Sequence, residues 1–198
     1  MTGAATAGSA TPAELVVCVD AADRSVGSCE KLAAHQPPGI RHRAFSVLLF
    51  DGQDRLLLQR RAAGKHHFGR CWSNSVCSHP RPGEDIVGAG RRRVQEELGL
   101  RVDLERAGRF EYRAVDAHSG LVEHEIDHVL IGRTAAMPHP DPGEVCELRW
   151  TSAPDLAGWL ERDPGAFTPW MVLALRAVSA SPQLPPAFSA PAESPWTS

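Results

Sequence analysis

The chain has 198 residues, of which 42% are hydrophobic and 23% charged, and its formal net charge is −3 at pH 7. This length and composition suit one globular domain, and the small negative charge with only one short basic cluster, at 91–93, disfavours a nucleic-acid surface. No apolar run approaches the roughly 20 residues that cross a bilayer, and no basic segment followed by an apolar one opens the chain, so neither membrane insertion nor export is expected.

The hydrophobic pattern predicts one domain between two irregular ends. Residues 1–13 and 179–198 are rich in small residues or proline, without hydrophobic period, so both are expected to be disordered. The domain itself is expected to cover 14–178. Strands are expected at 14–20, 43–50, 55–60, 110–114, 122–133 and 147–151, and helices at 28–35, 84–98, 154–162 and 164–178.

Turn and cap residues set several of these boundaries. Ser28 is expected to cap the first helix, and the Pro-Pro-Gly segment 37–39 to stop it. The polar segment 51–54 between two β-rich runs predicts a hairpin. Gly99 predicts the end of the second helix, although two glycines inside that helix weaken its propensity. Together the elements predict an α+β fold, an α/β/α sandwich in which helices flank a mixed sheet.

The residues that suggest chemistry gather at two places. One is the run Asn-Ser-Val-Cys-Ser-His-Pro, in which Cys77 and His79 lie two residues apart. The other is an alternating run in which Glu123 and Glu125 would project from one face of a strand and His124 from the other. A thiol, imidazoles and paired carboxylates together suggest proton transfer beside a metal ion.

The segment 78–100 follows the Nudix pattern in register at most positions. The matching residues are Glu84, Arg92, Val94, Glu96, Glu97, Gly99 and Leu100. Ser78 stands where the pattern has its first glycine, and Arg93 stands where it has the glutamate of an Arg-Glu pair. Arg93 thus replaces one expected metal ligand. Because it lies one helical turn before Glu97, it can also pair with that carboxylate. This difference weakens the interpretation of the chain as a hydrolase, whereas diphosphate binding is still expected.

Six motifs follow one another in a fixed order along the chain. They are Glu-Lys-Leu-Ala-Ala-His at 30–35, Arg-His-Arg-Ala-Phe-Ser at 41–46, Trp-Ser-Asn-Ser-Val-Cys-Ser-His-Pro at 72–80, Tyr-Arg-Ala at 112–114, Gly-Leu-Val-Glu-His-Glu at 120–125 and Pro-Trp-Met-Val at 169–172. In order and spacing they resemble the motifs of the type I isopentenyl-diphosphate isomerases. The resemblance covers about residues 14–176. It implies a Nudix-like fold and a place in isoprenoid biosynthesis.

The resemblance implies a reaction that moves the double bond of a five-carbon diphosphate, interconverting the isopentenyl and dimethylallyl forms through a tertiary carbocation. It identifies Cys77 and Glu125 as the groups that deliver and remove protons, with Tyr112 supporting Glu125 by a hydrogen bond. Trp170 matches the aromatic residue that stabilises the cation. The positions implied to meet the diphosphate are Lys31, Arg61 and Lys65, with Arg93 as a further candidate.

The resemblance also implies two metal ions. The first site would consist of His35, His42, His79, Glu123 and Glu125. Three imidazoles and two carboxylates suit Mn²⁺ or Zn²⁺ better than Mg²⁺, because nitrogen ligands favour borderline transition metals. The second ion, Mg²⁺, would lie between Glu97 and the diphosphate of the substrate.

Two other functions fit parts of the sequence. A Nudix pyrophosphohydrolase would use Mg²⁺ and the pair Glu96-Glu97 to direct water at a phosphoanhydride, but Arg93 and the Cys77 motif argue against it. A noncatalytic Nudix-like module would bind a metabolite or RNA, but the complete set of His and Glu ligands argues against that function. The sequence leaves open the oligomeric state, the native metal and which of Cys77 and Glu125 acts as the forward acid.

Each of these residues also has a structural explanation when it is considered alone. Cys77 would most often be a small buried hydrophobic residue, and Trp170 or Tyr112 an ordinary core aromatic. The five cysteines form no CxxC pair, which disfavours a disulfide framework and favours a reducing compartment. A cytoplasmic location is therefore expected.

Overall fold

The computed structural model describes residues 14–189 and 196. Its strands are β1 (Leu15–Val19), β2 (Ser25–Glu30), β3 (His42–Phe50), β4 (Leu56–Arg61), β5 (Trp72–Ser73), β6 (Val76–Ser78), β7 (Leu104–Val115), β8 (Val122–Arg133) and β9 (Val145–Thr151). Its helices are α1 (Lys31–His35), α2 (Ile86–Leu98), α3 (Ala153–Arg162), α4 (Pro169–Ala177) and α5 (Pro186–Ser189), with a 3₁₀ turn η1 (Pro164–Ala166).

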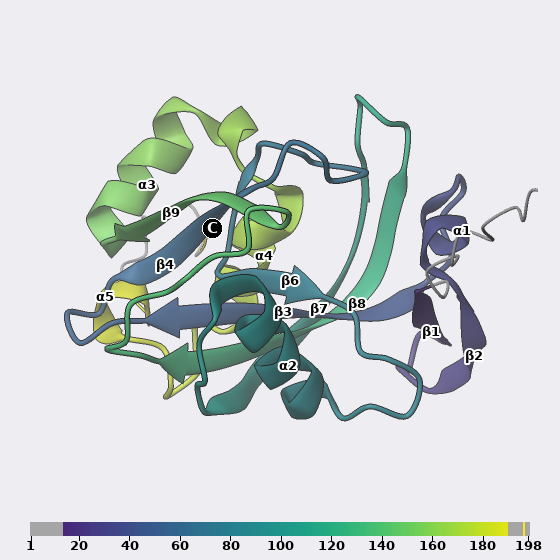
Figure 1. The fold of residues 1–198 in the computed structure, drawn as a ribbon, viewed down its shortest axis with the longest axis horizontal. Coiled ribbons are helices and arrows are strands. Elements are labelled where there is room, and N and C mark those ends of the chain that lie inside the picture. The colour runs from purple at the N-terminus through teal and green to yellow at the C-terminus, as the bar shows by residue number, and fades with distance from the viewer. Residues whose placement is uncertain (1–13, 190–195, 197–198) are drawn as a thin grey trace, which may run out of the picture.

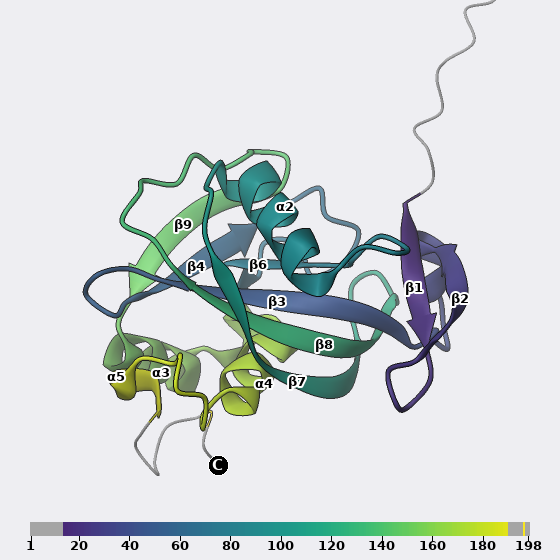
Figure 2. The same cartoon turned by 90° about the horizontal axis from the view of Figure 1, so that it is seen from below.

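Strand β3 is the centre of a mixed sheet. It runs parallel to β8 along its whole length and antiparallel to β6, β4 and β1 at successive points. Helix α2 covers one face of the sheet, and α3, α4 and α5 cover the other, while the β1–β2 hairpin and α1 stand at one end (Figures 1 and 2). The expected α+β sandwich with helices on both faces is confirmed.

Alternate residues of β3 build two cores. Phe45, Val47 and Leu49 pack with α2, whereas Leu48 and Phe50 pack with the helices on the opposite face. Since side chains of a strand alternate between faces, the even-numbered residues 42, 44 and 46 share the face that α4 covers. The polar side chains of the candidate site therefore lie on the α4 side of the sheet.

Helix α2 has defined ends and a close contact with the sheet. The side chain of Asp85 accepts hydrogen bonds from the N–H groups of Val87 and Gly88, and Gly99 ends the helix in the left-handed conformation at φ 67°. A Cβ on Gly90 would lie 2.5 Å from a methyl carbon of Leu130. This glycine, which weakens helix propensity, is thus required by the close approach of helix and sheet.

The first expected helix is confirmed at its C-terminal end, but its expected start is wrong. The predicted span 28–35 contains the end of β2, and only Lys31–His35 is helical. Ser28 lies in the strand opposite Val17, so it does not cap a helix. The backbone hydrogen bonds that β1 offers here outweigh the weak local preference for a helix.

Several other boundaries also differ from those expected. The hairpin at 51–54 is present, but β3 and β4 pair only at Phe50 and Leu56, and β4 pairs mainly with β9. The expected helix 164–178 divides into η1 and α4, because Phe167 and Thr168 are extended between them. The short strands β5 and β6 were not expected.

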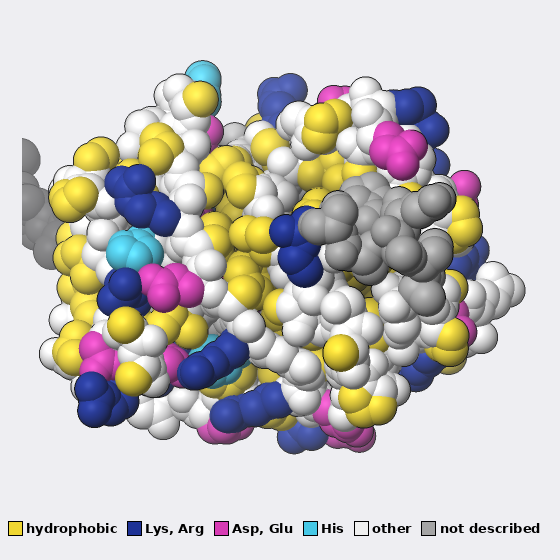
Figure 3. All heavy atoms as spheres, turned by 180° about the vertical axis from the view of Figure 1, so that it is seen from behind, with side chains coloured by type: hydrophobic (Ala, Val, Ile, Leu, Met, Phe, Trp, Pro, Cys, Tyr) yellow, Lys and Arg dark blue, Asp and Glu magenta, His cyan; other side chains and the backbone are white. Residues whose placement is uncertain are grey.

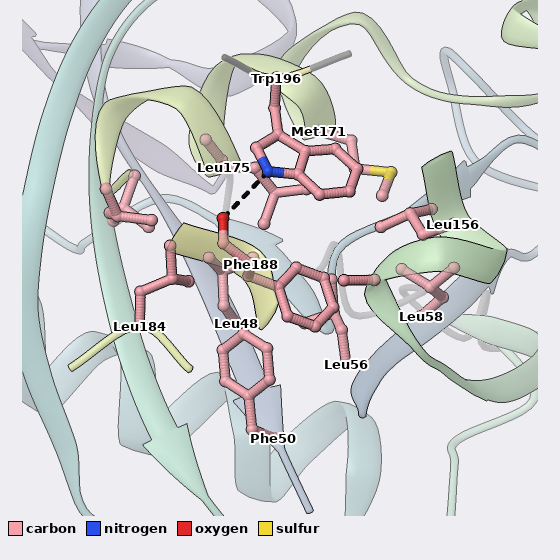
Figure 4. Packing of buried hydrophobic residues seen from close by; sticks show 14 of the residues in the cluster. Leu48, Phe50, Leu56, Leu58, Leu156, Met171, Leu175, Leu184, Phe188 and Trp196 are labelled. Carbon is pink, nitrogen blue, oxygen red and sulfur yellow. Dashed lines mark hydrogen bonds between the residues drawn. The ribbon is translucent and has the colours of Figure 1, made fainter. Parts of the chain in front are cut away.

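The described part of the C-terminal segment packs against the core. Leu184, Phe188 and Trp196 are buried in the cluster on the α4 face, and the indole N–H of Trp196 donates to the backbone oxygen of Phe188 at 3.0 Å (Figure 4). At these positions the structure differs from the disorder expected for 179–198, because the many prolines of the segment hid the pattern of its three apolar side chains. The rest of that prediction, at 190–195, 197 and 198, concerns residues outside those described. The expected disorder of 1–13 concerns residues outside those described.

The face of the molecule opposite to the one seen in Figure 1 carries both hydrophobic and basic side chains. Hydrophobic side chains gather in a band down its middle, and basic side chains are dispersed around that band (Figure 3). Within residues 14–189 and 196, the longest helix has 13 residues, and none combines the length and apolar character that crossing a bilayer requires.

The packing of the C-terminal segment predicts a measurable contribution to stability. The ring of Phe188 meets Phe50 edge to face at 5.2 Å and stacks on Trp196 at 5.8 Å. We expect Phe188→Ala to lower the free energy of unfolding by about 3 to 5 kcal/mol, because it removes a fully buried ring and leaves a cavity. Denaturant-induced unfolding measures this change.

A matched control is Met137→Ala, since Met137 is 75% exposed and its loss should change the free energy by less than about 0.5 kcal/mol. A loss below about 1 kcal/mol for Phe188→Ala would mean that the segment does not pack on the core in solution.

Candidate active site

Five polar side chains from separate parts of the chain converge in the interior. His35 ends α1, His42 begins β3, His79 follows β6, and Glu123 and Glu125 lie on one face of β8. All five are buried, and each offers a ligand atom within 4.8 Å of the others. The predicted ligand group is therefore brought together by the fold, although its members span 91 positions of the sequence, from 35 to 125.

Backbone carbonyls orient two of the imidazoles. His35 Nδ1 lies 2.6 Å from the oxygen of Lys31, and His42 Nδ1 lies 2.7 Å from the oxygen of Ile40. A carbonyl only accepts, so each Nδ1 carries the proton and each Nε2 keeps its lone pair for the interior of the cluster. This is the arrangement that metal-binding histidines need.

The cluster contains acceptor atoms that face one another. His35 Nε2 and Glu123 Oε2 are 2.9 Å apart, and neither has a hydrogen-bond partner among the described residues. Two lone pairs at this distance repel, so a proton on His35 or a metal ion between the two atoms is required. The donor set of three nitrogens and two carboxylates fits a divalent metal ion.

The ionisation states in the cluster also suit metal binding. Burial lowers the pKa of His79 to about 4, so its imidazole is neutral. Burial opposes the ionisation of Glu125, but the adjacent imidazoles of His42 and His79 outweigh it and hold the pKa of Glu125 well below its usual range. Glu125 Oε1 lies 2.8 Å from His79 Nε2 and 3.3 Å from His42 Nε2.

Cys77 lies on the same face of the sheet as the two carboxylates. It is paired with Ser46 across β6 and β3, and the Ser46 hydroxyl donates to Asp127 Oδ2 on β8 at 2.8 Å. The Cys77 sulfur is 4.0 Å from the same hydroxyl. Burial and the nearby Asp127 and Glu125 carboxylates raise the pKa of Cys77 well above its usual value, so it is a thiol at neutral pH.

The predicted aromatic residues close the same region. The Tyr112 hydroxyl donates to Glu125 Oε2 at 2.7 Å, and burial raises the pKa of Tyr112 so that this proton is retained. Trp170 donates from its indole nitrogen to Ser73 Oγ at 3.1 Å and meets the ring of Phe68 edge to face. Its ring centroid is 6.1 Å from that of Tyr112.

The residues expected to meet the diphosphate lie in more than one place. Lys65 and Arg93 share one carboxylate, since Lys65 forms an ion pair with Glu144 and Arg93 Nη2 lies 3.3 Å from it. Arg93 also binds Glu97 Oε1 at 2.5 Å, and Gln59 donates to the other oxygen of Glu97 at 3.3 Å. The carboxylate of Glu97 is buried, and its partner there is the guanidinium of Arg93.

Arg61 and Lys31 have other partners. The Arg61 guanidinium donates to the backbone oxygens of His67 and Phe68 at 3.1 Å and lies 5.5 Å from the centroid of the Trp170 ring. Lys31 pairs with Glu14 at 3.0 Å and is partly exposed. Arg61 thus supports the loop after β4.

Three residues at the site were not predicted from the sequence. Asp127 continues the alternation that begins at Glu123, so the period of two could have identified it. Glu144 and His67 had no such signal, because both lie in loops without periodicity. His124 contacts Glu111, away from the paired carboxylates, as the strand alternation predicted.

Comparison with known proteins identifies the family. A profile of the NUDIX domain matches residues 40–171. The chain is 49% identical over 170 residues to an isopentenyl-diphosphate Delta-isomerase of Nocardia farcinica, covering 86% of this chain and 95% of that protein. It is 45% identical over 157 residues to an isopentenyl-diphosphate Delta-isomerase of Burkholderia multivorans, covering 79% and 88%.

Solved structures agree on the fold. The crystal structure of DR0079 from Deinococcus radiodurans superposes with a TM-score of 0.67 at 21% identity, covering 83% of this chain and 99% of that one. A MutT NUDIX hydrolase from Burkholderia pseudomallei gives a TM-score of 0.52 at 24% identity, covering 70% and 98%. The chain shares the overall fold of these structures, and it belongs to the Nudix family and, within it, to the isopentenyl-diphosphate Delta-isomerases.

Proposed function

We propose that the protein interconverts isopentenyl diphosphate and dimethylallyl diphosphate, with Cys77 and Glu125 transferring the protons. The observation that carries this assignment is the placement of a half-buried thiol on the same sheet face as a buried carboxylate and its imidazole partners, in a chain of this family. The reaction supplies both five-carbon precursors of isoprenoid chains, and a cytoplasmic location belongs to the same proposal.

The two groups have complementary proton states. The Cys77 thiol retains its proton because its pKa is raised, and Glu125 is ionised because its pKa is held low. One group delivers a proton to the terminal carbon of the double bond, and the other removes a proton from the carbon on the far side of the cation. In the reverse direction the roles exchange, and Tyr112 keeps one oxygen of Glu125 fixed throughout.

The positive charge of the intermediate needs partners that do not react with it. The faces of Trp170 and Tyr112 attract a cation by roughly 1 to 2 kcal/mol in a dry site. Trp170 is 1% exposed and Tyr112 is 8% exposed, so water, which would capture a carbocation, is largely excluded.

The metal assignments belong to this proposal. His35, His42, His79, Glu123 and Glu125 would hold Mn²⁺ or Zn²⁺, which suits their nitrogen-rich donor set. Such an ion supplies positive charge that lowers the pKa of a bound carboxylate and orients it. Glu97 would hold the Mg²⁺ that accompanies the diphosphate, while Lys31, Arg61, Lys65 and Arg93 are assigned to the anionic end of the substrate.

The assay that tests the proposal follows both products. Purified protein incubated with isopentenyl diphosphate, Mg²⁺ and Mn²⁺ is expected to form the dimethylallyl isomer without releasing phosphate. Release of phosphate would instead support the Nudix hydrolase, which the Arg93–Glu97 pair disfavours by occupying a metal-binding carboxylate. If neither product forms, the result would support a noncatalytic module.

Replacement of the thiol tests the proton transfer. We expect Cys77→Ala to lower kcat by about 10² to 10⁴-fold, the usual contribution of a positioned acid or base, while the thermal unfolding midpoint stays nearly constant. Isomer formation and unfolding are measured on the same preparation.

Cys71→Ala is the matched control, because Cys71 is a partly buried thiol six positions earlier, just before β5. Its rate should equal that of the unaltered protein. A near-normal rate for Cys77→Ala would remove Cys77 from the mechanism.

Replacement of the α2 carboxylate tests the Mg²⁺ assignment. Glu97→Gln keeps the shape of the side chain but removes its charge, so the Mg²⁺ concentration for half-maximal activity should rise about tenfold or more. Glu96→Gln is the control, since Glu96 lies on the same helix and is 39% exposed. If both variants reach half-maximal activity at the same Mg²⁺ concentration, Glu97 does not hold this ion.

A further inference from the structure

His67 lies against the ligand cluster from the loop between β4 and β5. Its Nε2 is 2.5 Å from Glu123 Oε1. Its ring stacks on that of His35, with centroids 4.9 Å apart and an interplanar angle of 27°. His67 therefore touches two of the five cluster residues, although it does not belong to the group whose ligand atoms converge.

The two oxygens of Glu123 have different neighbours. Oε1 faces His67, whereas Oε2 faces His35 Nε2 and has no hydrogen-bond partner in the described part of the chain. A carboxylate oxygen accepts, so His67 donates from Nε2, and its Nδ1 keeps the lone pair. His35 has the opposite tautomer, because its Nδ1 donates to the oxygen of Lys31. The two stacked rings thus present opposite kinds of atom to Glu123.

We propose that His67 is a positioning residue of the metal site. Its Nε2–H holds Oε1 of Glu123, so that the carboxylate offers Oε2 alone to the metal ion. Hydrogen bonds from outside the coordination sphere that orient a ligand typically change metal affinity by 10 to 100-fold. The inference rests on the proposed metal site but not on the proposed proton transfers.

The stacked rings also shield the cluster. His35 and His67 line a pocket of about 180 Å³, together with Lys31 and His66, and Glu123 is not part of its lining. Glu123 is 4% exposed, and its oxygens lie behind these rings. Water that would compete for the Glu123 oxygens is kept away by the same side chain that orients them.

The test is metal affinity, measured without substrate. Metal-free full-length protein is titrated with Mn²⁺, and separately with Zn²⁺, in competition with a fluorescent chelator. We expect His67→Phe, which keeps a ring against His35 but lacks the N–H donor, to raise the dissociation constant by about 10 to 100-fold. His67→Gln retains an N–H donor and should recover at least part of the affinity.

His66→Phe is the matched control. His66 lines the same pocket, but no hydrogen bond or ion pair joins it to the cluster within residues 14–189 and 196. Its dissociation constants should equal those of the unaltered protein. Thermal unfolding of each metal-free variant verifies the fold, and His67→Ala replaces the Phe variant if that variant is unfolded.

Three results would overturn the inference. The first is a dissociation constant for His67→Phe within twofold of the unaltered protein. The second is a Gln variant as weak as the Phe variant, which would show that the N–H donor does not matter. The third is failure of the unaltered protein to bind either metal, which would remove the metal site itself, while the isomerase assay separately decides the reaction.

Discussion

The parallel pairing of β3 with β8 is the constraint on which the site depends. It places His42 directly opposite Glu125 and brings Ser46 within reach of Asp127. Because β6 pairs with the other edge of β3, the thiol of Cys77 arrives on the same face. A shift of this register by one residue would turn every carboxylate of β8 towards α2, so the apolar alternation that fixes the core also fixes the site.

The same strand carries three buried carboxylates, and their charges must be balanced. An unpaired ionised carboxylate is costly in the interior, whereas one that is hydrogen-bonded to several donors is tolerated. Glu123 and Glu125 are surrounded by imidazoles, while burial and the charge of Glu125 raise the pKa of Asp127 well above its usual value. The carboxylates of this strand in turn raise the pKa of the Cys77 thiol, which therefore keeps its proton.

The sequence predicts those features that depend on local pattern. Strict alternation located β8 with the bounds that the structure has, and one glycine located the end of α2. Features decided by distant partners were missed. Strand β2 is stabilised by β1, Trp196 by core residues far away in the sequence, and His67 by a carboxylate 56 positions later. The motifs predicted the residues of the His and Glu cluster, but only the fold shows which oxygen of Glu123 each histidine faces.

Arg93 explains how the Nudix helix can serve a reaction without hydrolysis. Burial raises the pKa of Glu97, and Arg93 opposes that effect by pairing with the carboxylate. A bare ion that approached Glu97 would have to displace Arg93 without offering it another partner. An ion that arrives with a diphosphate brings anionic oxygens for both Arg93 and Lys65. In the proposed mechanism, the departure from the hydrolase pattern would therefore couple occupation of α2 by Mg²⁺ to occupation of the pocket by the substrate, so that the diphosphate would be anchored and not cleaved.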